Sequence, residues 1–166
     1  MNLYIVRHAE ALPVGGIIAR DAERKLSPRG GEDAALMGRA LAHLDPNLEI
    51  IVTSPLRRAI ETGEIMGKEI SDHPTMRVSE HLAPGLNARA LLRELLALSA
   101  GSSIAVVGHQ PDMSNFISYL ITGGQEASVA MSAGAVAKLI LEDSRHRAYL
   151  GWLLTPDAVK VLFTGL

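Results

Sequence analysis

The segment Leu3-Tyr4-Ile5-Val6-Arg7-His8 decides the fold, because an apolar run of strand length stops there at two polar residues. Two later segments repeat the pattern: Ile50-Ile51-Val52 leads into Thr53-Ser54, and Ile104-Ala105-Val106-Val107 leads into Gly108-His109. Unbroken apolar runs of this kind are typical of strands buried on both faces, as in a parallel sheet that helices cover. The three runs therefore predict the central strands of such a sheet.

Apolar residues at helical spacing separate and follow these runs. They lie within residues 34–44, 91–98 and 113–121, and each set falls on one face of a helix. Segments 135–141 and 149–154, with a polar stretch between them, are predicted to pair as an antiparallel hairpin. The order of elements predicts an α/β fold: a three-layer sandwich with a mostly parallel central sheet, flanking helices and a C-terminal antiparallel hairpin.

The composition limits the class of protein. The 166 residues suit one domain over residues 1–166, and 48% hydrophobic with 20% charged residues fits neither a disordered nor a fibrous chain. The net charge of −2 argues against a nucleic-acid partner. The absence of cysteine excludes disulfides, thiolate nucleophiles and cysteine-based zinc sites.

The start of the chain and its apolar runs bear on location. The residues before Arg7 hold no basic segment, so no signal peptide is expected. No stretch reaches the ~18 apolar residues that cross a bilayer. We therefore expect a cytoplasmic protein with no membrane partner. No exposed apolar stripe stands out in the sequence, so a monomer is the default expectation.

Basic and imidazole side chains follow the predicted strands. Arg7-His8 ends the first run, Arg57-Arg58 lies just inside the helix after the second, and His109 follows the last. Ligands of open α/β sheets bind beyond the carboxyl ends of the strands, so these residues should share one site. Arginine forks match phosphate oxygens, a neutral imidazole can attack phosphorus, and a second imidazole can stabilise the phosphoryl oxygens. The pattern predicts phosphoryl transfer through a covalent phosphohistidine.

Four segments, in this order, resemble motifs of the histidine phosphatase superfamily, which includes the phosphoglycerate mutases. Arg7-His8-Ala9-Glu10 resembles its Arg-His-Gly motif, and Leu26-Ser27-Pro28-Arg29-Gly30 resembles its Leu-Thr-x-x-Gly turn. Residues 54–62 resemble its Ser-x-x-x-Arg-Ala-x-x-Thr segment, and Gly108-His109 resembles its second histidine motif. The resemblance covers most of the chain. The short length and His109-Gln110-Pro111 most resemble the small SixA-like phosphohistidine phosphatases.

The resemblance implies a role for each matching residue. His8 would be the nucleophile, and Arg7 would clamp the phosphate. Arg58 would be the second clamp, in preference to Arg57, because the family's arginine directly precedes the alanine. His109 would stabilise the phosphoryl oxygens and, with the two arginines, bind the substrate.

The resemblance leaves other roles open. Arg24, near the end of a long loop over Pro13–Lys25, is a further candidate for substrate binding, and the role of that loop is undefined. The proton donor is unknown. Mutase-like members place a glutamate after the third strand, and Glu80 and His81 lie in that neighbourhood without a clean match. Acid phosphatase-like members place an aspartate directly after the second histidine, where this chain has Gln110.

Three functions remain for comparison. The first is a metal-independent phosphatase that acts through phosphorylated His8 on phosphohistidine in a partner protein, such as a phosphohistidine-carrying domain. The second is a phosphomonoesterase of the same superfamily that acts on a small phosphate ester. The third is an inactive module that recognises phosphate without turnover. No cofactor is implied, and no metal is expected, because arginines beside two histidines oppose a bound cation. His43, His73 and His146 are interpreted as surface residues.

Overall fold

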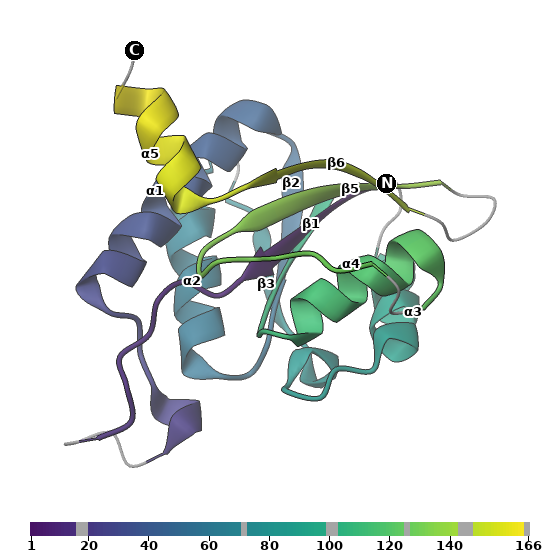
Figure 1. Cartoon of the computed structure of the whole chain (residues 1–166), viewed down its shortest axis with the longest axis horizontal. Coiled ribbons are helices and arrows are strands. Elements are labelled where there is room, and N and C mark those ends of the chain that lie inside the picture. The colour runs from purple at the N-terminus through teal and green to yellow at the C-terminus, as the bar shows by residue number, and fades with distance from the viewer. Residues whose placement is uncertain (16–19, 71–72, 99–102, 125–126, 143–147, 165–166) are drawn as a thin grey trace.

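The computed structural model describes residues 1–15, 20–70, 73–98, 103–124, 127–142 and 148–164, and in these residues six strands form one sheet in the order β3-β2-β4-β1-β5-β6 (Figure 1). The strands are β1 (Asn2–Arg7), β2 (Leu48–Thr53), β3 (Thr75–Val78), β4 (Ser103–Gly108), β5 (Val136–Leu141) and β6 (Ala148–Leu154). Strands β3, β2, β4 and β1 run parallel, whereas β5 is antiparallel to both β1 and β6. The predicted α/β class and C-terminal antiparallel pair are confirmed.

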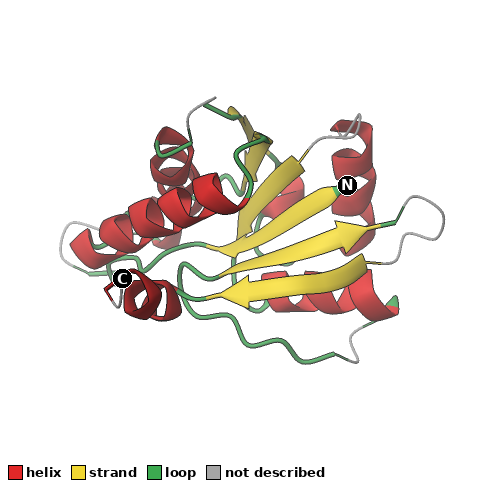
Figure 2. Cartoon of the chain, turned by 90° about the horizontal axis from the view of Figure 1, so that it is seen from above, coloured by secondary structure: helices red, strands yellow, loops and turns green. Residues whose placement is uncertain are grey.

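Helices cover both faces of the sheet, as Figure 2 shows. The helices are α1 (Pro28–Leu44), α2 (Arg57–Lys68), α3 (Ala88–Leu98), α4 (Asp112–Thr122) and α5 (Pro156–Thr164). Buried residues of α1, α2 and α5 belong to one apolar cluster, and those of α3 and α4 belong to another. The sheet lies between these two clusters, which gives the predicted three layers.

Strand β1 shows why its sequence is apolar without a break. Leu3 and Ile5 belong to the cluster that contains Phe116 of α4, whereas Tyr4 and Val6 belong to the cluster on the other face. These four residues of β1 are fully buried. Successive side chains of a strand point to opposite faces, so a strand covered on both sides requires an apolar residue at every position.

The register of the central strands brings their carboxyl ends to one edge of the sheet. Arg7 of β1 pairs with Gly108 of β4, and Val107 of β4 pairs with Thr53 of β2. Backbone hydrogen bonds continue beyond the strands, because the amide of His8 donates to the Gly108 carbonyl at 3.0 Å. The residues after β1, β2 and β4 are therefore neighbours.

The Gly30 turn packs closely beside this edge. A Cβ atom at Gly30 would collide with the carbonyl oxygen of Glu10, two residues after His8. Ser27 caps α1 through its hydroxyl, which accepts a hydrogen bond from the Gly30 amide at 3.0 Å and donates one to the Glu10 carboxylate at 2.8 Å. Glycine at this position is therefore needed for the start of α1 to approach the site.

Two elements have no counterpart among the elements located from the sequence. Strand β3 lies at the sheet edge and all four of its residues are exposed, so it carries no apolar run. Helix α5 follows the hairpin and packs on α1, with Val159 buried in the core. The loop over Pro13–Lys25 contains a 3₁₀ turn, η1 (Asp21–Glu23). Residues 16–19 of this loop and His146 lie outside the described residues.

An apolar hollow of about 540 Å³ lies between α1, β6 and α5, with Leu44, Trp152 and Leu162 among its lining residues. These residues come from distant parts of the sequence, so no apolar stripe at helical or strand spacing could predict this apolar surface. The expectation of a monomer rested on the absence of such a stripe and stays a prediction. Among the described residues, no helix has both the length and the apolar composition that a membrane span requires.

Candidate active site

Four side chains from three strand ends meet at the carboxyl edge of the sheet. Arg7 is the last residue of β1, and His8 follows it. Arg58 lies in the first turn of α2, which begins shortly after β2, and His109 directly follows β4. The His8 and His109 ring centroids lie 5.2 Å apart, and Arg58 Nε lies 3.2 Å from His8 Nε2. The structure therefore brings the four residues selected from the sequence together.

Hydrogen bonds define which nitrogen of His8 is free to react. Nδ1 lies 2.7 Å from the carbonyl oxygen of Ala9, which can only accept, so Nδ1 carries the proton and donates it. Nε2 of the neutral ring consequently keeps its lone pair, and this atom accepts a hydrogen bond from Arg58 Nε. The ring is thus held in the tautomer that a nucleophile at Nε2 needs.

The surroundings keep both imidazoles neutral. Burial, together with the positive charges of Arg58, Arg7 and Arg24, lowers the pKa of His8 to about 4, against the opposing effect of the hydrogen bond to the Ala9 carbonyl. Burial and the neighbouring His8 and Arg58 lower the pKa of His109 to about 4 as well, although Asp21 opposes this shift. At neutral pH His8 is therefore a free base rather than an imidazolium.

We expect the His8 ring to stay unprotonated well below the ordinary histidine range. Since the pKa of His8 is lowered to about 4, the ring should gain a proton only as the pH falls toward that value, and with His8 as the nucleophile kcat/KM should decline there and not near 6.5. The direct measurement is an NMR titration of the imidazole carbon-bound protons, with the His8 signal assigned by its absence in His8→Ala. Arg58→Ala should raise the midpoint, because it removes a positive neighbour. A midpoint near 6.5 in the unsubstituted protein would contradict this expectation.

Arg7 and His109 each carry a buried nitrogen with no hydrogen-bond partner among the described residues, Nε of Arg7 and Nδ1 of His109. The other contacts of these side chains hold them in place. Arg7 Nη1 donates to the Met131 carbonyl at 2.7 Å, and His109 Nε2 lies 2.7 Å from Ser54 Oγ. A buried polar group without a partner is costly. Two such atoms in one site are typical of a pocket that binds a polar ligand.

Ser54 helps to set the protonation of His109. Its hydroxyl oxygen accepts a hydrogen bond from the Leu56 amide at 3.3 Å, so its own proton is available for His109 Nε2. When Ser54 donates, the proton of the neutral His109 ring lies on Nδ1, the nitrogen without a partner. His109 would then offer an N–H donor suited to a phosphoryl oxygen.

The two adjacent arginines differ sharply in environment. Arg58 is only 5% exposed, and its Nη1 and Nη2 donate to the carbonyl oxygen and the carboxylate of Asp21 at 2.8 and 3.0 Å. Arg57 is exposed and its Nε donates to Glu61 Oε1 at 2.7 Å. The first turn of α2 thus directs Arg58 toward His8, and Arg57 pairs with Glu61 on the helix surface.

The weaker candidates lie outside this group. Arg24 Nε donates to the Leu12 carbonyl at 2.6 Å, and Arg24 Nη1 pairs with Asp21 Oδ1 at 3.1 Å. Asp21 therefore lies between Arg24 and Arg58. Glu80 and His81 form part of η2 (Glu80–Leu82), which follows β3, and both are exposed. In the described part of the chain, no hydrogen bond or ion pair joins either of them to His8, Arg58 or the other site residues.

Two residues that contact the site, Thr62 and Asp21, were not selected from the sequence. Thr62 Oγ1 accepts a hydrogen bond from the Ala9 amide at 3.1 Å and donates one to the Arg58 carbonyl at 2.7 Å, so it joins the turn after β1 to α2. Its position at the end of the 54–62 segment was a signal that could have found it. Asp21 has no such signal, because it is a polar residue in a loop.

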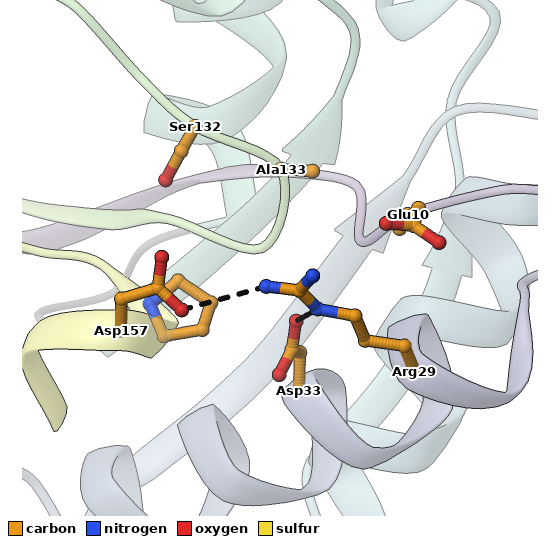
Figure 3. Close-up of a pocket in the computed structure, with 7 residues that line it drawn as sticks. Glu10, Arg29, Asp33, Ser132, Ala133 and Asp157 are labelled. Carbon is orange, nitrogen blue, oxygen red and sulfur yellow. Dashed lines mark ion pairs between the residues drawn. The ribbon is translucent and has the colours of Figure 1, made fainter. Parts of the chain in front are cut away.

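A hollow of about 150 Å³ lies beside the site (Figure 3). Ser132 and Ala133 line it, and they belong to the segment whose Gly134 amide donates to the carbonyls of Arg7 and His8. Arg29 lies between Asp33 and Asp157 in this hollow, at 3.8 and 3.6 Å. The positive charge of Arg29 is therefore balanced by these two carboxylates. Within the described ranges, no three His, Asp or Glu side chains are grouped closely enough to hold a metal ion.

Comparison with known proteins identifies the family. The model of the histidine phosphatase superfamily (branch 1) matches residues 3–83, which include Arg7, His8 and Arg58. An uncharacterised protein of Picosynechococcus is 34% identical over 126 residues, which are 74% of this chain and 74% of that protein. Phosphohistidine phosphatase SixA of Escherichia coli is 25% identical over 163 residues, which are 97% of this chain and 98% of that enzyme.

A solved structure agrees with the sequence comparisons. The protein histidine phosphatase SixA complexed with tungstate superposes with a TM-score of 0.84 at 25% identity, covering 95% of this chain and 98% of the other. This superposition covers 95% of the chain and so extends beyond residues 3–83, which the family model matches. The chain therefore belongs to the histidine phosphatase superfamily and is a hydrolase of that type.

Proposed function

We propose that the protein is a metal-independent phosphatase that carries the phosphoryl group on His8 and removes it from phosphohistidine in a partner protein. The observation that carries this proposal is the hydrogen bonding of the His8 ring, which leaves Nε2 with a lone pair beside the Arg58 guanidinium. Arg7, Arg58 and His109 supply the positive charge and N–H donors that a phosphoryl group requires, so no bound cation is needed to neutralise its charge.

The reaction takes place in two displacements at phosphorus. In the first, the lone pair of His8 Nε2 forms a bond to phosphorus while the P–N bond to the substrate imidazole breaks. The proton stays on His8 Nδ1, which keeps its hydrogen bond to the Ala9 carbonyl, and the phosphoryl oxygens compensate the positive charge on the phosphorylated ring. In the second, water attacks phosphorus, the P–Nε2 bond breaks, and its electrons return to His8. Inorganic phosphate leaves as H₂PO₄⁻, which carries both protons of the water and exchanges them with solvent.

The choice of phosphohistidine as substrate rests on the leaving group. An alkyl phosphate expels a strongly basic alkoxide, which needs a positioned proton donor. Phosphohistidine expels neutral imidazole when the second ring nitrogen carries a proton, so it needs none. Among the described residues, no carboxylic acid is hydrogen-bonded to His8 or His109, and Asp21 pairs with two arginines. The name of the Escherichia coli relative, phosphohistidine phosphatase, supports the same substrate class.

A substrate survey tests this proposal. We expect kcat/KM for a phosphohistidine-bearing protein or peptide to exceed that for a simple alkyl phosphate by at least about 10-fold, since the alkyl ester lacks the acid catalysis it depends on. Aryl phosphates should lie between them. Turnover should persist with EDTA present, and His8→Ala corrects for spontaneous hydrolysis. An alkyl phosphate as best substrate would refute the substrate class, and loss of turnover with EDTA would refute metal independence.

The same reasoning predicts small effects at the two proton-donor candidates. Glu80→Gln and His81→Ala should each change kcat for phosphohistidine cleavage by less than about 3-fold, because the leaving imidazole needs no donor. Steady-state kinetics on phosphohistidine and on an aryl phosphate check this. A loss of about 100-fold or more in Glu80→Gln would show that Glu80 reaches the leaving group and serves as the acid.

A further inference from the structure

One residue of the 13–25 loop binds both terminal nitrogens of the buried arginine. Arg58 Nη1 donates to the main-chain oxygen of Asp21 at 2.8 Å, and Arg58 Nη2 donates to its carboxylate at 3.0 Å. The two contacts span 37 positions of sequence. Because Asp21 contributes a backbone and a side-chain acceptor, it fixes the plane of the guanidinium, and its carboxylate also balances the positive charge.

This arrangement determines which edge of Arg58 faces the nucleophile. A guanidinium is planar and rigid, and its N–H groups point outward in a fixed fork. The end that carries both Nη atoms is held by Asp21, whereas Nε lies on another edge and donates to His8 Nε2 at 3.2 Å. A phosphoryl group on His8 would therefore meet the Nε edge of Arg58, with Asp21 holding the opposite end.

Asp21 is itself held in place by Arg24. Its second carboxylate oxygen pairs with Arg24 Nη1 at 3.1 Å, and Arg24 is in turn anchored by the carbonyl oxygens of Leu12 at 2.6 Å and Ala11 at 3.4 Å. Hydrogen bonds from Arg24, and further contacts with Arg58, keep the pKa of Asp21 below its usual range, so it remains a carboxylate. A chain of contacts thus runs from the backbone after β1, through Arg24 and Asp21, to Arg58.

We propose that Asp21 is a positioning residue for phosphoryl transfer, which acts by holding the Nη end of Arg58 so that its Nε edge faces the phosphoryl group on His8. The inference rests on the proposed function and adds a residue to its machinery. It also gives Arg24 a role one step further back, as the support of Asp21 rather than as a ligand of the phosphate. Catalysis depends on placement within fractions of an ångström, and misplacement by about 1 Å can cost on the order of 100-fold in rate.

The test compares Asp21→Ala in two backgrounds. In the unsubstituted protein we expect kcat to fall about 10- to 100-fold, because Arg58 loses its fixed orientation. In the Arg58→Ala background, measured in single turnovers with enzyme in excess, adding Asp21→Ala should change the rate by less than about 2-fold, since there is no fork left to orient. An equal loss in both backgrounds would overturn the proposal.

A matched control comes from the same turn. Glu23→Ala removes one negative charge from η1, yet in the described structure no hydrogen bond or ion pair joins the Glu23 side chain to Arg58, so its kcat should stay within about 3-fold of the original. Equal losses in Asp21→Ala and Glu23→Ala would assign the effect to charge alone and overturn the positioning role. So would full activity of Asp21→Ala.

A second readout does not depend on turnover. The Arg58 Nε–H signal in a ¹⁵N-correlated NMR spectrum should shift or broaden in Asp21→Ala and stay unchanged in Glu23→Ala. If the protein cleaves none of the phosphates surveyed but the signal responds in this way, the proposed function fails while the contact that fixes Arg58 stands. If turnover is present and the signal and kcat of Asp21→Ala are unchanged, the positioning role fails alone.

Discussion

Replacing His8 with alanine is expected to lower kcat by at least about 10⁴-fold and to abolish the covalent intermediate, as removal of a nucleophile commonly does. The reason lies in the geometry of Nε2, which is the lone-pair nitrogen next to Arg58 and has no substitute at that point. His109 lies nearby, but its Nε2 is hydrogen-bonded to Ser54 and so is not available to attack phosphorus. No other described imidazole is within contact of His8.

The intermediate provides the sharpest measurement. Rapid quenching of a reaction with ³²P-labelled substrate should trap label that is stable in base and labile in acid, as expected of a phosphohistidine, and peptide mapping should place it at His8. His43→Ala is a matched control, because His43 lies on the surface of α1 with Nδ1 bonded to the Arg39 carbonyl at 2.9 Å. This variant should retain both label and rate. Substantial turnover or label in His8→Ala would reject His8 as the nucleophile.

The strands predicted most directly from the sequence are those that contain several consecutive apolar residues. Strands β1, β2 and β4 lie in the middle of the sheet, so each contains a run of apolar residues that covers both faces, although Glu49 near the start of β2 is exposed. The site followed from the same feature, since His8 and His109 each come directly after such a run. Their meeting in one site could be predicted because the ends of neighbouring parallel strands lie at the same edge of the sheet.

The parts that could not be predicted depend on contacts between distant segments. Strand β3 is an exposed edge strand, and its pairing with β2 is visible only in three dimensions. Helix α5 is short, and it gains its place by packing on α1. Asp21 is 57% exposed at its side chain, so neither burial nor periodicity marks it, yet it holds the Arg58 fork. A loop residue that acts through one long-range contact leaves no local pattern.

Arg58→Ala is expected to lower kcat by about 10²- to 10³-fold, the usual loss when one donor to a transition-state oxyanion is removed. Arg58 is buried between His8 and Asp21, where little water can replace its charge, so the developing phosphoryl charge would be left uncompensated. Arg57→Ala, one residue away, should stay within about 3-fold, because Arg57 is exposed and pairs only with Glu61 among the described residues.

Arg58→Lys separates charge from geometry in the same comparison. Lysine keeps the positive charge but lacks the planar fork, so it cannot contact His8 Nε2 and both acceptors of Asp21 in the same arrangement. We therefore expect Arg58→Lys to recover only part of the activity lost in Arg58→Ala. Steady-state kinetics on an aryl phosphate, with circular dichroism to check folding, rank the three variants. A larger loss in Arg57→Ala than in Arg58→Ala would mean that the other arginine contacts the phosphoryl group, and the assignment of the site would have to change.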